Sequence, residues 1–230
     1  MSCGPHVARR RLLWAACTAL LAAAPAWAHN CEGPPLLREA TSQQIGEYVS
    51  GSGKRVLSFV GYSGAGYEDA AAMRAAAWQA LQRHDPAHWL VNIGGTAVGI
   101  GEVYELAKAA GFVTLGIVST RARDGGDALS PCVDQVFFVR DASWGGRMPG
   151  STRLAPTSAA LVAHSSEFVG IGGGEVARDE LAAARAAGKP VHFVPADMNH
   201  RLARDKARAK GQPEPSDLRG AAAALFAPRP

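Results

Sequence analysis

The sequence predicts an α/β protein with a Rossmann-like, doubly wound, mostly parallel sheet that carries helices on both faces in a single domain. Short apolar runs alternate with helical patterns from residue 55 to residue 194, an order typical of parallel sheets with crossover helices. The runs are apolar almost without interruption, as in strands buried on both faces. Three of them lead through a glycine-rich turn into a helix, which is an arrangement that binds anionic ligands.

The first 28 residues have the pattern of a secretory signal peptide. Arg9 to Arg11 form a positive region, Leu12 to Ala24 form an apolar core, and Ala26-Trp27-Ala28 forms a small-residue cleavage site. Arg10 and Arg11 also fit a twin-arginine signal loosely. We therefore expect an exported protein, periplasmic or secreted, that has no membrane association after the signal is removed.

Charge and cysteine content narrow the choice of partners and cofactors. The formal net charge of +4 includes three arginines of the signal, so the rest of the chain carries +4 − 3 = +1, which implies neither nucleic acid nor an anionic membrane as a partner. Cys31 and Cys132 remain after cleavage and could either form one disulfide or stay as two thiols. Two thiols without a histidine pattern do not make a zinc site, so we expect no metal and no other cofactor.

Residues 29–54 are expected to form an irregular leader and a short helix from Ala40 to Val49, with Thr41 as its N-cap. The Rossmann-like domain then covers residues 55–198. Its first strand runs from Arg55 to Val60, and a glycine turn leads into an alanine-rich helix over Glu68–Arg83.

A second unit repeats this order and the remaining elements follow it. Strand Trp89–Ile93 precedes a glycine-rich turn over residues 94–101 and a helix over Glu102–Ala110, which Gly111 ends. The later elements share the same alternation of apolar and amphipathic runs: strand 112–118, polar loop 119–130, strand 133–139, long loop 141–156, helix 157–165, strand 168–171, helix 176–187 and strand 191–194. Residues 199–230 are expected to form a basic helix and a mobile Pro/Ala-rich tail.

The most informative stretch is the strand Phe168–Ile171 with the three glycines Gly172, Gly173 and Gly174 after it. Glycines at a helix N-terminus let the backbone approach an anion closely, although a tight turn without a ligand would have the same sequence. If this strand lies beside the strand Arg55–Val60, where strand order reverses, their two turns face one crevice. The ligand-binding residues predicted from the three turns are Gly61, Tyr62, Ser63, Gly94, Gly95, Thr96, Gly99, Gly172, Gly173 and Gly174.

Two parts of the chain resemble the LOG ("lonely guy", lysine decarboxylase-like) family of the SLOG superfamily of Rossmann-like nucleotide-binding proteins. These are VNIGG (residues 91–95) with AKAAGFVTLG (107–116), and HSSEFVGIGGG (164–174) with DELAAARAAGKPV (179–191). Of the family signature P-G-G-x-G-T-x-x-E the chain keeps Gly173, Gly174 and Glu180. Val176 and Ala177 replace Gly-Thr, and Thr157 stands where the family has its catalytic arginine.

The resemblance implies binding of a nucleotide or phosphorylated nucleoside and, in enzymatic relatives, hydrolysis of the N-glycosidic bond of a nucleoside 5′-monophosphate. Glu180 would then be the acidic group, and Arg153, four residues before Thr157, would supply the cation. The resemblance also implies a homodimer. Because Thr157, Val176 and Ala177 depart from the signature, a non-catalytic binding or sensing domain is the alternative.

A third interpretation is a serine hydrolase, because residues 61–65 nearly match the nucleophile elbow G-x-S-x-G around Ser63. Asp197 and His200 follow in the chain order that such a triad requires. Ala65 replaces the last glycine of the motif, however, and the first core strand leaves no room for the strands that usually precede the elbow.

Overall fold

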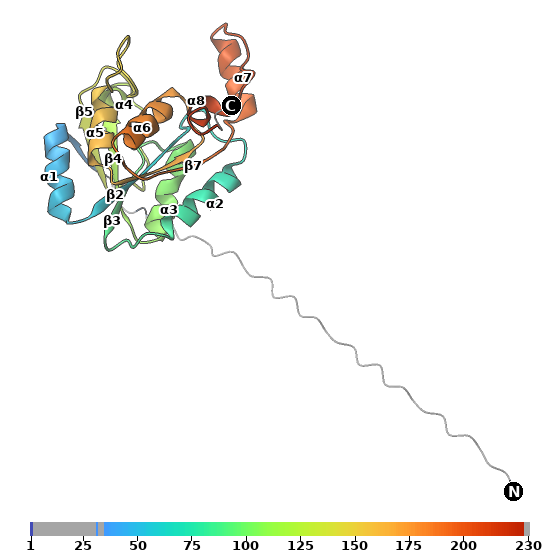
Figure 1. The fold of residues 1–230 in the computed structure, drawn as a ribbon, viewed down its shortest axis with the longest axis horizontal. Coiled ribbons are helices and arrows are strands. Elements are labelled where there is room, and N and C mark those ends of the chain that lie inside the picture. Colours follow the sequence, from blue (N-terminus) through green and yellow to red (C-terminus); the bar gives the residue numbers. More distant parts are fainter. Residues whose placement is uncertain (2–30, 32–34, 228–230) are drawn as a thin grey trace.

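The computed structural model describes Met1, Cys31 and residues 35–227 (Figure 1). The predicted signal peptide of residues 1–28 falls almost entirely outside the described residues. Among those that are described, no helix combines the length and the apolar character needed to cross a membrane.

Seven parallel strands form one sheet in the order β1-β5-β4-β3-β2-β6-β7. The strands are β1 (Leu36–Glu39), β2 (Arg55–Gly61), β3 (Trp89–Asn92), β4 (Val113–Ser119), β5 (Gln135–Val139), β6 (Glu167–Ile171) and β7 (Val191–Val194). The chain builds the sheet outward from β2 through β3 and β4 to β5 and then returns to place β6 on the other side of β2. This reversal confirms the predicted doubly wound α/β fold.

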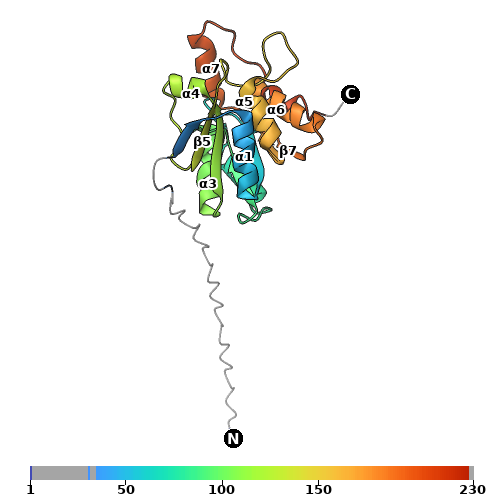
Figure 2. The same ribbon diagram turned by 90° about the vertical axis from the view of Figure 1, so that its left-hand side faces the viewer.

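Helices cover both faces of the sheet (Figure 2). The helices are α1 (Ser42–Ser52), α2 (Ala70–Leu81), the 3₁₀ turn η1 (Gly99–Glu102), α3 (Val103–Ala109), α4 (Thr120–Asp124), α5 (Pro156–His164), α6 (Glu175–Ala186), α7 (His200–Ala209) and α8 (Gly220–Ala223). One apolar core lies between the sheet and α2 and α3, and includes Met73 and Tyr104. The second core lies between the sheet and α1, α5 and α6, and includes Ile45 and Leu181.

Local sequence explains where several helices begin. Thr41 caps α1 as predicted, since its side chain accepts from the Gln44 amide while the Gln44 side chain accepts from the Thr41 amide. Asp69 caps α2 by accepting from the Ala72 amide. Pro156 is at the first position of α5, where its missing amide hydrogen costs nothing.

Three segments differ from the sequence-based expectation. The predicted leader contains β1, a four-residue edge strand that pairs only with β5 and whose exposed residues show no apolar alternation. The polar loop 119–130 contains α4, a short helix capped by Ser119. The tail expected to be mobile contains α8, which packs on α6 because Ala222 is fully buried in the second core.

Cys31 and Cys132 form a disulfide that closes 101 residues of chain. Cys132 is buried in the first core, and Cys31 packs against that core from the side. The bond therefore ties the chain just before the edge strand β1 to the segment just before β5, its neighbour in the sheet.

Candidate functional site

The three glycine turns predicted to bind a ligand lie at neighbouring positions on the carboxyl edge of the sheet. β2 pairs with β3 on one side and with β6 on the other, and Gly61 is in register with Ile171. The turns that follow these three strands are therefore adjacent. This confirms that β2 and β6 flank the reversal of strand order, the place at which doubly wound sheets bind ligands.

Several of these glycines are required by the packing of the turns against each other. A Cβ on Gly61 would lie 2.1 Å from the Tyr67 hydroxyl and 2.7 Å from the Ile171 carbonyl oxygen. Gly99 has a φ of +62° and a Cβ there would lie 2.3 Å from the Tyr62 carbonyl oxygen, which also accepts from the Ile100 amide at 2.7 Å. The neighbouring protein atoms at Gly61 and Gly99 leave no room for a Cβ, and this explains why both positions hold glycine.

The turn after β3 is also held by contacts within the protein, here by hydrogen bonds. The Tyr104 hydroxyl accepts from the amide of Gly95 at 2.9 Å and donates to the Leu115 carbonyl at 2.8 Å. The Thr96 hydroxyl accepts from the Val98 amide within its own turn. Gly94 has a φ of +69° and almost no neighbour near a Cβ position, so it lies at the open side of this turn.

Tyr62 fills the part of the crevice between β2 and β6. Its side chain is buried, and its hydroxyl donates to the carbonyl of Arg219 at 2.6 Å. A Cβ on Gly172 would lie 2.5 Å from the Tyr62 ring. Burial raises the pKa of Tyr62, so the hydroxyl stays a neutral donor at neutral pH.

The C-terminal strap, defined here as residues 217–227, covers the same part of the edge and lies between α6 and α7 (Figure 1). The Ala222 amide donates to the carbonyl of Gly173 at 3.0 Å. Further along, Phe226 stacks on Phe193 of β7 with ring centroids 4.2 Å apart, and Arg185 donates to the Leu225 carbonyl. The structure therefore closes this part of the predicted crevice with the protein's own residues.

The start of α6 remains open. Gly174 is the N-cap of α6, makes no side-chain capping bond, and a Cβ placed on it would meet no atom within 4 Å. The turn after β2 is also open at Ser63 and Gly64, which are both exposed. Across it, the Lys206 ammonium of α7 donates to the Gly64 carbonyl. A helix N-terminus without a cap favours an anion, and so does the Lys206 ammonium at the turn after β2.

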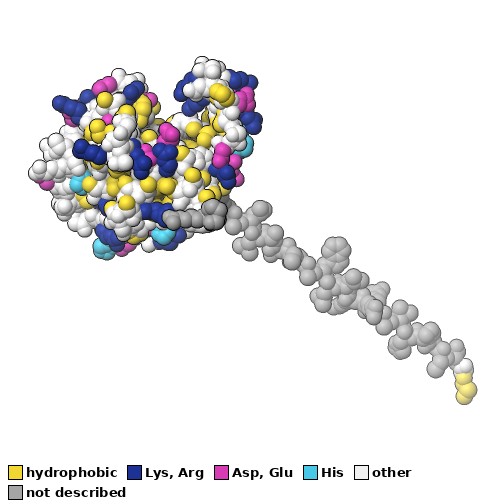
Figure 3. All heavy atoms as spheres, turned by 45° about the horizontal axis from the view of Figure 1, so that its top comes forward, with side chains coloured by type: hydrophobic (Ala, Val, Ile, Leu, Met, Phe, Trp, Pro, Cys, Tyr) yellow, Lys and Arg dark blue, Asp and Glu magenta, His cyan; other side chains and the backbone are white. Residues whose placement is uncertain are grey.

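Figure 3 shows the carboxyl edge as a hollow between two raised lobes, one of which carries α7. Lys and Arg side chains lie on both lobes. A separate cavity of about 370 Å³ lies beside this edge, lined by Ile171, by residues before and in the first turn of α2, by residues 194–197 at the end of β7 and after it, and by Arg219 of the strap.

Glu180 belongs to α6, and its side chain is buried between α6 and α5, not on the open carboxyl edge. Its side chain is only 6% exposed and accepts from the Ser158 hydroxyl of α5 at 2.6 Å. Burial raises the pKa of Glu180 to about 7, and the neighbouring carboxylate of Asp179 acts in the same direction. Ser158 in turn accepts from the Gly146 amide at 2.7 Å, so the pair joins α5, α6 and the loop between β5 and α5.

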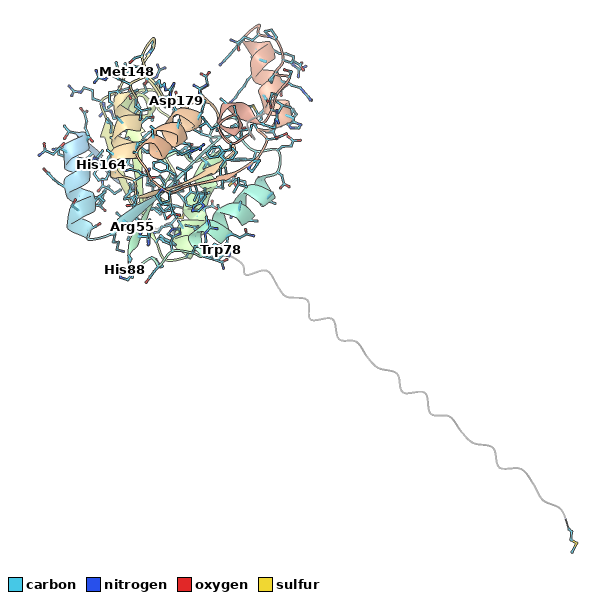
Figure 4. The ribbon with its side chains drawn as sticks, viewed as in Figure 1. Arg55, Trp78, His88, Met148, His164 and Asp179 are labelled. Carbon is cyan, nitrogen blue, oxygen red and sulfur yellow. A yellow bond between two sulfur atoms is a disulfide. The ribbon has the colours of Figure 1, made fainter. Side chains whose placement is uncertain are left out.

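Arg153 is not brought to Glu180. It is exposed on the loop between β5 and α5, and no hydrogen bond or ion pair joins it to Glu180 within the described residues. The loop reaches α6 through Arg147, whose amide donates to Asp179 at 3.0 Å and whose guanidinium lies 3.8 Å from the same carboxylate. Figure 4 shows Met148 of this loop and Asp179 at the same end of the molecule, opposite Arg55 and His88.

Thr157, which replaces the arginine of the family pattern, is buried at the first turn of α5. Its amide donates to Asp141 at 2.9 Å, while its hydroxyl has no hydrogen-bond partner within the geometric limits among the residues that the structure describes. Although burial alone would raise it, hydrogen bonds from Thr157 and Ser143 hold the pKa of Asp141 below its usual value. This position thus supports the loop between β5 and α5.

The serine-hydrolase interpretation requires Ser63, His200 and Asp197 to form a chain of hydrogen bonds. His200 does contact Asp197 at 3.1 Å, and its amide donates to Glu68 at 2.8 Å. No hydrogen bond joins Ser63 to His200 in the described part of the chain. The structure therefore does not assemble the triad.

Comparison with known proteins gives similarities to solved structures alone. No family model matches the chain, and no curated protein matches it. Protein TM1055 is 23% identical with a TM-score of 0.44, over 60% of this chain and 72% of that one. The Moco carrier protein from Chlamydomonas reinhardtii is 21% identical with a TM-score of 0.44, over 75% and 96%. The molybdenum cofactor binding protein from Rippkaea orientalis is 19% identical with a TM-score of 0.45, over 61% and 76%.

These similarities concern the fold. The Rossmann-like fold itself rests on the strand order of this chain.

Proposed function

We propose that this protein binds a nucleotide or another small phosphorylated nucleoside at the carboxyl edge of its sheet, and that it does so without hydrolysing the ligand. The observation that carries this proposal is the open start of α6 at Gly174, which follows β6 beside the carboxyl end of β2, the strand that also pairs with β3. The phosphate would accept from the free amides of the first turn of α6.

The surroundings of Gly174 support an anionic ligand. Lys206 lies at the exposed turn after β2 and can turn its ammonium from the Gly64 carbonyl to a phosphate. The open residues Ser63, Gly94 and Gly174 come from the three predicted turns, and they are the members of the predicted set that we assign to the ligand. Gly61, Tyr62, Gly99 and Gly172 would act indirectly by holding the turns together.

The position of Glu180 supports binding rather than hydrolysis. A group that stabilises an oxocarbenium-like centre has to reach the sugar, whereas this carboxyl group is buried and bonded to Ser158. Arg153, the predicted phosphate ligand, lies apart from it. Hydrolysis of the N-glycosidic bond is the second candidate, favoured by one observation, the pKa of Glu180 near 7, which suits a general acid or base.

Substitution of Gly174 tests the binding site, because the residue has an ordinary φ of −84° and free space around a Cβ. Asp at this N-cap should cap α6 and raise the free energy of unfolding by roughly a few tenths of a kcal/mol, because glycine is itself a fair N-cap. The same carboxylate would occupy the phosphate position, and we expect Gly174→Asp to weaken binding of AMP at least tenfold in calorimetry.

Gly174→Asn is the matched control, since it caps the helix without adding a charge. We expect it to bind AMP several-fold more tightly than the aspartate variant. Equal affinity of the wild type and Gly174→Asp would show that the phosphate does not bind at α6. Release of adenine from AMP that is lost in Glu180→Gln would favour the second candidate.

We also propose that the protein is exported, with residues 1–28 as its signal, and that it forms a homodimer. The disulfide between Cys31 and Cys132 supports an oxidising compartment. Leu36 and Leu37, which are 70% and 55% exposed on the edge strand β1, are apolar surface that a second copy could cover. N-terminal sequencing of the periplasmic protein and sedimentation equilibrium test these two points.

A further inference from the structure

We infer that the C-terminal strap is a displaceable cover of the part of the ligand site beside the open phosphate position, so that the nucleoside of a bound nucleotide and the docked strap compete for the carboxyl edge. This inference rests on the proposed function and concerns how the same site is regulated. It follows from where the strap docks, from how few large side chains anchor it, and from what it holds in place.

The strap docks on the turn that leads into the proposed phosphate site. Ala222 donates its amide to the carbonyl of Gly173, the residue just before the open N-cap of α6. A Cβ on Gly173 would lie 3.5 Å from the Ala222 side chain and 3.5 Å from the Cα of Gly61. The strap therefore contacts the turns of both β6 and β2, at the reversal of strand order where doubly wound sheets bind ligands.

The strap also fixes the side chain that fills the crevice. The Tyr62 hydroxyl donates to the strap carbonyl of Arg219 at 2.6 Å and lies 3.3 Å from the carbonyl of Ala196. Without the strap the shorter of these bonds is lost and only the longer one to Ala196 remains, so the hydroxyl is held less firmly in that position. Release of the strap would thus free both the Gly172–Gly173 turn and the Tyr62 ring.

The contact that holds the strap rests on few large side chains, because only Leu225 and Phe226 of the strap pack as large apolar groups on the second core. Near Tyr62 it consists of Gly220 and the alanines of α8, a helix of one turn that is too short to be stable alone. Its larger anchor is Phe226, stacked on Phe193 and lying under the Arg185 guanidinium. Segments with such limited burial open at lower free energy than the whole domain.

Gly220 allows the strap to be released by one substitution. Its φ is +71°, and a Cβ there would lie 2.4 Å from the Tyr62 hydroxyl and 2.5 Å from the Gly173 carbonyl oxygen. Gly220→Ala should therefore be incompatible with the docked strap. Gly211→Ala is the matched control, because Gly211 has a similar φ of +62° and no atom within 4 Å of a Cβ.

AMP affinity, measured by calorimetry on the full chain, tests the competition. A covered site binds with an apparent affinity reduced by the fraction of open molecules. We expect Gly220→Ala to bind AMP at least tenfold more tightly than the wild type, and Gly211→Ala to bind like the wild type. Phe226→Ala, which removes the anchor without crowding Tyr62, should also bind AMP more tightly than the wild type. It replaces Gly220→Ala in the test if that variant does not fold.

Hydrogen exchange on the wild type gives an independent readout. A ligand that merely stabilises the fold slows amide exchange, whereas a ligand that displaces the strap should speed exchange at Ala222 while protecting α6. Equal AMP affinity in the wild type and both strap variants, or slower exchange at Ala222 with AMP, would overturn the inference but leave the binding proposal intact. Absence of AMP binding in all of these proteins would overturn the proposed function and the strap's role with it.

Discussion

At the scale of single residues, the main finding is that Glu180 and Thr157, two positions singled out by the sequence resemblance, are both buried. Glu180 occupies the carboxylate position of the LOG-like signature, but it lies behind Ser158 in a buried contact between α5 and α6. Thr157, at the position of the missing arginine, is buried with a free hydroxyl. A buried carboxyl group is more stable when protonated, which accounts for the raised pKa of Glu180.

The titration of Glu180 should be visible in the pH dependence of stability. The pKa is about 7 in the folded protein, against about 4.3 for a free glutamate. The contribution of the neutral Glu180 carboxyl group to the free energy of unfolding is therefore fully present below pH 4 and is lost as the pH rises through 7. We expect the wild type to lose up to about 3 kcal/mol relative to Glu180→Gln between pH 4.5 and pH 8, measured by urea denaturation.

Glutamine keeps an oxygen for Ser158 and cannot ionise, which makes it the suitable reference. Parallel stability curves for the two proteins over this pH range would contradict a raised pKa. Ser158→Ala should not restore parallel behaviour, because burial, and not the hydroxyl, is the main cause of the shift.

At the scale of elements, the structure shows why some segments follow from local sequence and others do not. The helix α1 begins at the predicted cap because Thr41 and Gln44 satisfy each other's amides. The strand β1 has no such local signal. It is held in place by its pairing with β5 and by the disulfide beside it. The formation of helix α8 likewise depends on tertiary contacts, because Ala222 is buried in the second core.

The disulfide should make a large contribution to stability because it closes 101 residues of chain. A loop of this length is expected to contribute up to about 5 kcal/mol by restricting the unfolded state. We predict that the double variant Cys31→Ser/Cys132→Ser unfolds at a correspondingly lower urea concentration. Dithiothreitol should destabilise the wild type to the same level and leave the variant unchanged; an unchanged wild type would contradict the prediction.

At the scale of the whole molecule, two parts that are distant in sequence meet at the carboxyl edge of the sheet. The three glycine turns come from β2, β3 and β6, while α7 and the strap come from the end of the chain. Because α7 and the strap pack there, the edge is divided into a closed part at Tyr62 and an open part at Gly174. This division is what separates structural glycines from those assigned to the ligand.

Ligand binding should stabilise the whole domain by mass action. AMP at a free concentration of 100 times its dissociation constant is expected to add about 2.7 kcal/mol to the free energy of unfolding. Differential scanning calorimetry should record this as a rise in Tm of about 5–10 °C for a domain of this size. Adenosine at the same concentration is the control, and an equal rise with adenosine would show that the phosphate does not contribute.

The sequence by itself determined the parallel α/β architecture, the order of most strands and helices, and the placement of the glycine turns at strand ends. These follow from periodicity and from residues that act on near neighbours. Only the tertiary structure decided the neighbours of each turn, the burial of Glu180, the distance of Arg153 from it, and the docking of the strap. Those depend on contacts between residues far apart in the chain, such as Tyr62 with Arg219 and Gly173 with Ala222, and local sequence patterns carry no record of such pairs.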